Sequence, residues 1–191
     1  MKKNDYFVLI LILFSLMVFL FQPYSHELLA YQYQPIQQGE YWRLITHTLA
    51  HTNFFHLMMN IAGLILILFV FISTFKHTPL FSLFIFNTLF ISVCLVFFES
   101  HHLTYVGLSG TLHGLFSYAV CRDILRKEKW GELLAVIGVL KIIGEQYFGT
   151  AQTTSHLINA PVLVNAHLYG AIAGIFFFIL RDLSKYFKLR N

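Results

Sequence analysis

Six long apolar stretches run along the chain, and polar or aromatic-rich segments separate them. A helix that crosses the hydrocarbon core of a bilayer needs about 20 apolar residues, with some tolerance for tilt and membrane thinning. The pattern therefore predicts an all-α polytopic membrane protein, a six-helix bundle with a short fourth helix, in one membrane domain over residues 1–191. The predicted spans are 6–21, 54–75, 80–98, 107–120, 131–148 and 166–180.

Two of the connecting segments are long enough to have a role of their own. Residues 22–53 are rich in Tyr, Gln, His and Trp and poor in cations, a composition that suits the membrane interface. Residues 149–165 are polar or small and precede the last span. Loops of this length are often lids over a site, although simple disorder would have the same composition. We expect the first segment to be an interfacial loop and the second a cap loop.

Composition and charge agree with a lipid environment. Hydrophobic residues make up 57% of the chain and charged residues 12%, against about a quarter charged in a typical soluble domain. Of the thirteen Lys and Arg residues, eleven fall on one side of the six-span arrangement, with Arg43 on the other side and Lys141 inside the fifth span. The positive-inside rule makes the cation-rich side, with both termini, cytoplasmic. The positive charge therefore indicates topology and contact with the lipid bilayer, and no nucleic-acid partner is expected.

The fourth and sixth spans carry two polar side chains at the same depth. Ser109 lies thirteen residues before Arg122, and His167 lies fourteen residues before Arg181. At the helical rise, these side chains lie about 20 and 21 Å above their cytoplasmic arginines, in a core about 30 Å thick. Both spans run in the same direction, so we expect the serine and the histidine to meet below the outer surface of the membrane.

The second span runs in the same direction and adds polar groups to this layer. His56 and Asn60 are four residues apart and share one helix face. Counting back from Lys76 puts Asn60 about 24 Å above the inner anchor, within one turn of the serine and the histidine. Polar groups at this depth are costly unless they face the bundle interior or a water-filled cavity. The three spans therefore predict a buried polar layer.

These residues have the chemistry that acyl transfer needs. A serine hydroxyl becomes an effective nucleophile when a neighbouring base, here His167, accepts its proton. The backbone N–H of Ser109, at the start of a helix, is free to face a developing oxyanion, and Asn60 and His56 offer side-chain donors. The layer therefore predicts a serine hydrolase site.

Each residue type also has a purely structural interpretation. A membrane serine usually bonds back to a carbonyl one turn earlier, and an isolated Asn60 would join helices. Gly107 and Gly110 would let backbone and substrate approach closely, whereas Gly170 and Gly174 form a GxxxG pattern typical of helix packing. The coincidence in depth of the serine and the histidine favours catalysis, because packing alone does not require it.

The acidic residues narrow the mechanism. The three aspartates fall at the cytoplasmic ends of spans, so the paired aspartates of an aspartyl protease are absent from the chain. The sequence contains no HExxH motif of a zinc protease. We expect no Asp or Glu to reach His167 as the third member of a triad, and the arrangement is then a Ser-His dyad with no metal and no other cofactor. The residues expected to hold the interfacial loop and its neighbours together are Glu40, Arg43 and Glu99.

The ordered motifs of the chain resemble those of the rhomboid intramembrane serine proteases, in their six-span bacterial form. These motifs are GLSG at 107–110, AHLYGAIAG at 166–174, HLMMN at 56–60 and YWR at 41–43. The GLSG motif alone is weakly specific, whereas the ordered set spans nearly the whole chain. Relatives often carry Tyr one turn after the serine, stacked on the histidine, and this chain has His113 there.

The resemblance implies that Ser109 is the nucleophile and His167 the base. The residues implied to form the oxyanion site or to line the pocket are His56, Asn60, Gly107, Gly110 and His113. It also implies that the short fourth helix is central in the bundle, that the loop after the fifth span caps the site and that the fifth span borders a lateral substrate entrance. We therefore expect an intramembrane serine endopeptidase of the bacterial inner membrane. Its partners would be single-pass transmembrane protein substrates, cut near the periplasmic side, to which the active site opens.

Two other functions are open at this point. An inactive relative that binds membrane segments would usually lack the serine or the histidine, and both are present. A metal or proton transporter would use His47, His51 and His56, of which the first two have a spacing that metal ligands adopt. We expect no intramembrane carboxylate to join these histidines, which weakens the transporter hypothesis. The sequence does not indicate an oligomeric state.

Overall fold

Six long helices form most of the chain that the structure, a computed structural model, describes, namely residues 3–183. Their bounds are α1 Lys3–Leu20, α5 Phe54–Val70, α7 Leu80–Phe98, α8 Ser109–Leu125, α9 Gly131–Phe148 and α11 Val164–Phe178. Each overlaps one of the apolar stretches that predicted a helix, so the all-α class is confirmed. A π-helix, η1 Ile179–Leu183, continues α11.

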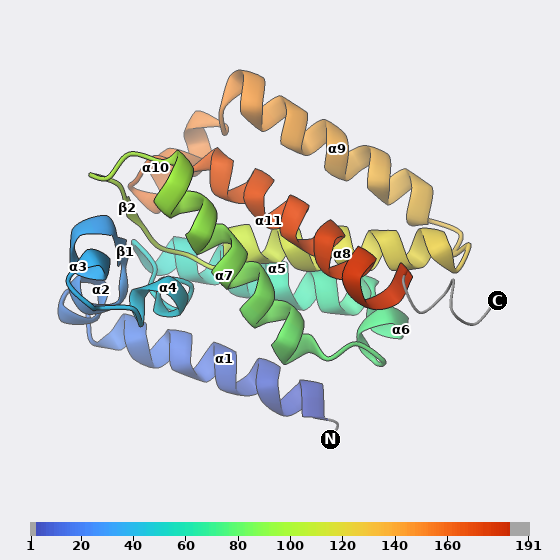
Figure 1. Cartoon of the computed structure of the whole chain (residues 1–191), viewed down its shortest axis with the longest axis horizontal. Coiled ribbons are helices and arrows are strands. Elements are labelled where there is room, and N and C mark those ends of the chain that lie inside the picture. Colours follow the sequence, from blue (N-terminus) through green and yellow to red (C-terminus); the bar gives the residue numbers. More distant parts are fainter. Residues whose placement is uncertain (1–2, 184–191) are drawn as a thin grey trace.

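Successive long helices run in alternating directions along the bundle (Figure 1). The start of α1 and the end of α11 lie at the same end of the bundle as the short helix α6, Ile72–Phe75. The interfacial segment and the short helix α10, Gln152–Ile158, lie at the opposite end. Four of the cations used to orient the chain, Lys2, Lys185, Lys188 and Arg190, lie outside the described residues.

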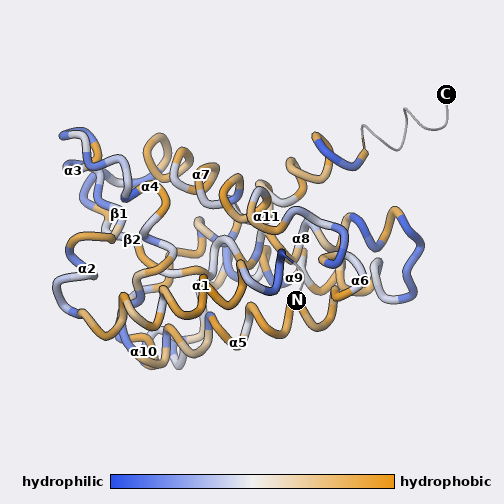
Figure 2. Tube along the Cα trace, turned by 90° about the horizontal axis from the view of Figure 1, so that it is seen from below, coloured by the Kyte–Doolittle hydropathy of each residue, from blue (hydrophilic) through white to orange (hydrophobic). Residues whose placement is uncertain are grey.

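Length and composition make three of the described helices able to cross a membrane, namely α1, α7 and the continuous segment Val164–Leu183. Helices α9 and α10 meet the same standard only together, although they are bent by 84° relative to one another. Helix α5 is apolar but has 17 residues, and α8 does not meet the standard. Hydrophobic residues follow the long helices, and hydrophilic residues gather at the two ends of the bundle (Figure 2). The number of six spans therefore stays a prediction, although six long helices are present.

Several boundaries differ from those predicted. The second apolar stretch is not one helix, because the chain breaks at Phe71 between α5 and α6. The predicted interfacial loop contains α2 Tyr24–Leu29, β1 Tyr31–Gln32, α3 Tyr33–Gln37 and α4 Arg43–Thr46, and the predicted cap loop contains α10. Helix α8 extends to Leu125, beyond the apolar stretch. The apolar pattern of a sequence locates the segments that face lipid or the protein core. It does not locate short helices in polar loops, because these are stabilised by tertiary contacts.

Strand β1 of the interfacial segment pairs antiparallel with β2, Thr104–Tyr105, which lies just before α8. Arg43 holds this segment together. Its Nε contacts Glu40 Oε2 at 2.6 Å, and its Nη1 donates to the carbonyls of Glu27 and Ala30 at 2.7 and 2.8 Å. The structural role predicted for Arg43 and Glu40 is therefore confirmed.

Glu99 joins the end of α7 to the start of α11. Its Oε1 accepts hydrogen bonds from Asn165 Nδ2 and from the Tyr169 hydroxyl, both at 2.8 Å. Glu99 therefore has a structural role, but its bonds join α7 to α11, on either side of His167, rather than to the predicted interfacial loop.

Helix α8 lies at the centre of the bundle and contacts α5, α7, α9 and α11. Its buried apolar side chains, among them Leu112, Leu115 and Tyr118, belong to the largest hydrophobic cluster of the described chain. This central position places the first turn of α8 where several helices can present side chains to it.

Candidate active site

Ser109 and His167 are in direct contact. Ser109 is the first residue of α8, and His167 lies in the first turn of α11. The distance between His167 Nε2 and Ser109 Oγ is 3.0 Å, which is a hydrogen bond. The histidine is buried, whereas the serine is partly accessible. The structure therefore brings together the two residues that the sequence placed at one depth.

Glycines allow the two helices to approach closely enough for this contact. A Cβ atom on Gly170 would collide with the carbonyl group of Gly110, and one on Gly174 would collide with that of Gly114. Such small-residue contacts are typical of close helix packing in membranes. The predicted packing role of Gly170 and Gly174 is therefore confirmed.

Gly110 allows the close approach of backbone that was predicted, but not that of a substrate. A Cβ there would lie 2.9 Å from the carbonyl oxygen of Ala166 and 2.9 Å from the Tyr105 hydroxyl. The space around Gly110 is thus occupied by protein rather than open to a substrate. This glycine serves helix packing, because the backbone of α11 passes directly over it.

Gly107 lies against the two side-chain donors predicted for the oxyanion site. Its φ of +115° is one that side-chain-bearing residues rarely adopt, and a Cβ there would lie 2.7 Å from His56 Nε2 and 3.7 Å from Asn60 Nδ2. The Gly107 N–H donates to the carbonyl of His47 at 2.9 Å, which anchors this turn. The turn before Ser109 therefore lies beside both donors.

Asn60 and His56 are both buried on α5. Within the described chain, Asn60 Nδ2 has no hydrogen-bond partner, which is unusual for a buried amide. His56 Nδ1 lies 3.4 Å from the Thr52 backbone nitrogen and 3.1 Å from the Thr52 hydroxyl oxygen. The Asn60 amide donor and the His56 imidazole thus lie beside the turn that leads to the serine, where an oxyanion site needs donors.

His113 stacks on His167, with ring centroids 4.1 Å apart and an interplanar angle of 17°. Its Nδ1 donates to the carbonyl of Ser109 at 2.8 Å, and its Nε2 accepts from Lys141 Nζ at 2.9 Å. His113 therefore lines the cavity, as expected, and in addition stacks on His167.

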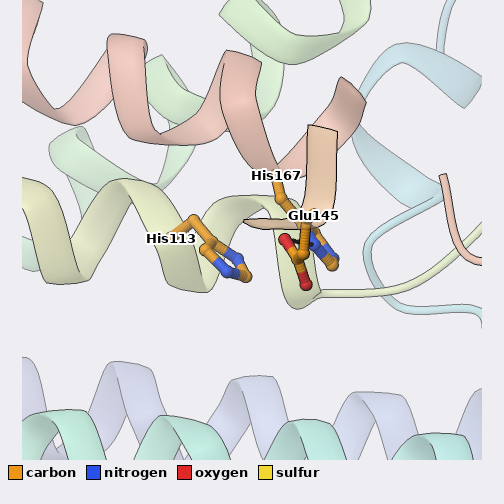
Figure 3. A group of neighbouring side chains, drawn as sticks. All are labelled: His113, Glu145 and His167. Carbon is orange, nitrogen blue, oxygen red and sulfur yellow. Dashed lines mark hydrogen bonds and ion pairs between the residues drawn. The ribbon is translucent and has the colours of Figure 1, made fainter. Parts of the chain in front are cut away.

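Glu145 corrects one expectation from the sequence. We expected no acidic residue to reach His167, yet Glu145 Oε2 lies 2.9 Å from His167 Nδ1 (Figure 3). Glu145 comes from α9, and its other oxygen accepts from Lys141 Nζ at 2.7 Å. The signal was present in the sequence, because Lys141 and Glu145 are charged residues four apart within an apolar span, and such charges usually mark function.

A cavity of about 670 Å³ opens onto the serine and the histidine. Its walls include Met59 and Asn60 of α5 and Phe148 of α9, and the chain from Gly149 to Leu163 covers it. The Thr52 hydroxyl donates to the carbonyl of Ile158 at 2.6 Å, and this bond ties α10 to the loop that precedes α5. The segment predicted as a cap loop therefore does lie over the cavity.

The three histidines of the transporter hypothesis do not gather at one point of the described chain, although the rings of His51 and His56 contact each other, with centroids 5.0 Å apart. His47 Nε2 lies 3.0 Å from Ser92 Oγ, and His51 Nδ1 lies 3.1 Å from the carbonyl of Leu49. Burial lowers the pKa of both side chains to about 3, so both are neutral at physiological pH. Between residues 3 and 183, the histidines and acids that gather closely enough to share a metal ion are His113, Glu145 and His167. The Lys141 ammonium already contacts two of these three residues, so the chain supplies its own cation there.

The fold and the site define a polytopic helical membrane protein with a Ser-His pair under a cap. The family model of the Rhomboid domain matches residues 38–182. The chain therefore belongs to the rhomboid family, a family of intramembrane proteases, and it is an integral membrane protein. A comparison with curated proteins gives no match.

Proposed function

We propose that this protein is an intramembrane serine endopeptidase that cleaves single-pass transmembrane proteins by an acyl-enzyme mechanism. The observation that carries the proposal is the 3.0 Å contact between His167 Nε2 and Ser109 Oγ at the base of a capped cavity. Membership of the rhomboid family supplies the reaction class. The mechanism requires no metal and no organic cofactor.

In the first step, Ser109 Oγ attacks the carbonyl carbon of the scissile peptide bond while His167 Nε2 accepts the hydroxyl proton. The carbonyl oxygen becomes an oxyanion, stabilised by Asn60 Nδ2, His56 Nε2 and the backbone N–H of Ser109. The imidazolium then gives its proton to the leaving amine as the C–N bond breaks, which leaves an acyl-serine. Water, deprotonated by His167, hydrolyses this ester and restores the serine.

The proposed topology follows from the charges at the two ends of the bundle. Both termini are cytoplasmic in a bacterial inner membrane, and the site opens to the periplasmic side. The oxyanion donors and the cap lie at the end opposite α6 and the basic loop after α8. The protein is one membrane domain over residues 1–191. Its partners are the lipid bilayer and a transmembrane protein substrate, and it does not bind nucleic acid.

Cleavage of a single-span substrate by the purified protein in detergent or liposomes tests the proposal. Ser109→Ala and His167→Ala are expected to reduce cleavage at least about 1000-fold, because nucleophile and base act as a unit. A fluorophosphonate probe should label the wild type at Ser109, and His167→Ala should abolish this labelling.

Ser117→Ala is the matched control, since this serine lies on the same helix and donates to the carbonyl of Ala171 at 2.8 Å. It should be labelled like the wild type. Equal cleavage by the wild type and Ser109→Ala would overturn the proposal, and a binder without activity would show neither labelling nor cleavage. Loss of cleavage on metal chelation would show that the activity depends on a metal ion, contrary to the proposal.

A further inference from the structure

Two charged side chains of helix α9, those of Lys141 and Glu145, lie in the candidate active site. Lys141 and Glu145 lie one turn apart, with Lys141 Nζ 2.7 Å from Glu145 Oε1, and the Glu145 side chain is only 13% exposed. A carboxylate at membrane depth is costly unless it is paired and hydrogen-bonded. Glu145 satisfies both conditions, because each of its oxygens has a partner, Lys141 on one side and His167 on the other.

The contact with Glu145 selects one tautomer of His167. An ionised carboxylate can only accept hydrogen bonds, so His167 Nδ1 must carry the proton that it donates over 2.9 Å. The lone pair is then on Nε2, which faces Ser109 Oγ at 3.0 Å. This is the tautomer that a general base needs, since the other one would present a hydrogen to the hydroxyl.

The ring of His167 is held on its face as well as on its edge. His113 stacks on it and is itself held by the carbonyl of Ser109 and by the Lys141 ammonium. Lys141 thus joins Glu145 to His113 and closes a ring of contacts around His167. Figure 3 shows the side chains of His113, Glu145 and His167 gathered at one place.

Helix α9 is otherwise loosely attached to the bundle. Of its eighteen residues, only Gly131 at its start is buried. Its outer half ends in Tyr147 and Phe148, which are 81% and 89% exposed. The polar contacts of this half of the helix with α8 and α11 are those of Lys141 and Glu145 and a bond from Gln146 Nε2 to the carbonyl of Val164 at 3.2 Å.

We propose that Glu145 is a positioning residue for His167, and that the base is fully oriented only while α9 lies against α8 and α11. This inference rests on the proposed function and adds a means of regulating the same site. Glu145 sets the tautomer before the reaction and stabilises the imidazolium after His167 has taken the serine proton. The proton stays on the imidazole, and no bond to Glu145 forms or breaks. A displacement of α9 would remove the carboxylate from the histidine.

The rate of acylation of Ser109 by a fluorophosphonate probe tests this role, because the probe reports on the nucleophile without a bound transmembrane helix. We expect Glu145→Gln to slow labelling and kcat by about 10- to 100-fold, the usual effect of losing a hydrogen bond to a charged group. KM and the thermal unfolding midpoint should change little, since Gln keeps the size of the side chain. Glu145→Asp keeps the charge on a shorter side chain, and its labelling rate should lie between those of the wild type and Glu145→Gln.

Glu132→Gln provides the matched control, since this glutamate is exposed in the first turn of the same helix. Its labelling rate should equal that of the wild type. Nitrogen-15 spectra of histidine-labelled protein give a readout that does not depend on turnover. In the wild type, His167 should appear as the Nδ1-protonated tautomer alone. In Glu145→Gln, it should appear as a mixture of the two tautomers.

Two outcomes separate this inference from the proposed function. If Ser109→Ala is inactive but Glu145→Gln is labelled within twofold of the wild-type rate, the positioning role is wrong and the protease proposal stands. If Glu145→Gln loses labelling only in proportion to a loss of folded protein, while the tautomer of His167 in the folded fraction is unchanged, Glu145 is structural and the inference is also wrong. Cleavage by Ser109→Ala would instead refute the proposed function.

Discussion

Gly170 of α11 lies directly against the carbonyl group of Gly110 of α8, with no room for a Cβ atom between them. This contact is one residue away from Ser109 on α8 and three residues after His167 on α11. The distance between the two reacting atoms, 3.0 Å, therefore depends on how closely these helices approach. The glycine pair and the catalytic pair are parts of the same helix interface.

Gly170→Ala should consequently separate α8 from α11. We expect a loss of stability of about 1–3 kcal/mol from overpacking and a large loss of fluorophosphonate labelling. Gly144→Ala is the control for stability, because a Cβ at that helical position meets nothing within 4 Å. It should be neutral or stabilising by about 0.5–1 kcal/mol. Thermal unfolding in detergent measures both, and equal midpoints for the two variants would contradict this account.

Asn53 both caps α5 and holds the cap segment. Its Oδ1 accepts from the backbone N–H of His56 at 2.9 Å, and its Nδ2 donates to the carbonyl of Leu157 at 2.7 Å. Asn53→Asp keeps the acceptor and removes the donor. We expect amide hydrogen exchange in α10 to become about five- to tenfold faster, while α5 stays protected.

Asn4→Asp is the matched control for this change. Asn4 Nδ2 donates to the carbonyls of Phe75 and Thr78 at the other end of the bundle. This variant should leave exchange in α10 unchanged. Slow exchange of α10 in Asn53→Asp would show that the cap is held by other contacts.

Arg43 is expected to be indispensable for the interfacial segment. Arg43→Met would leave the buried carbonyl of Ala30 and that of Glu27 without their donor, at a cost of about 1–3 kcal/mol for each group. Arg43→Lys should retain only part of the stability that Arg43→Met loses, since a single ammonium does not reproduce the several donors of the guanidinium group. Thermal unfolding midpoints should fall in the order wild type, Lys, Met. Arg126→Met, at an exposed position, should have no comparable effect.

The buried histidines of the interfacial segment make stability depend on pH. Burial lowers the pKa of His47 and His51 from 6.5 to about 3, so the unfolded chain binds protons below about pH 6.5 that the folded protein does not. Stability should therefore be constant above about pH 7 and fall as the pH decreases from 6.5 toward 3. Thermal unfolding midpoints measured between pH 8 and 4 give the slope of stability against pH.

His47→Gln should make this slope shallower, because it removes one titrating group while its amide can still reach Ser92. His102→Gln, at an exposed position, should leave the slope as it is in the wild type. Identical slopes in all three proteins would mean that these histidines do not account for the acid sensitivity.

The sequence alone determined the features that depend on regular helices in lipid. Apolar runs located the six long helices, and counting from the cytoplasmic arginines put Ser109 and His167 at one depth, because a helix has a constant rise per residue. The motif order identified the family. The same regularity allowed the GxxxG face of α11 to be recognised before its partner on α8 was known.

Only the tertiary structure decided which side chains from separate helices touch. Depth along a helix says nothing about rotation around it, so the sequence did not show that Glu145 of α9 faces His167. It also left His113 without a defined contact, although its stacking on His167 and its bond to Lys141 follow once α8, α9 and α11 are packed. Short helices such as α10 escaped the pattern for a related reason, since they are held by bonds from Thr52 and Asn53 rather than by an apolar face of their own.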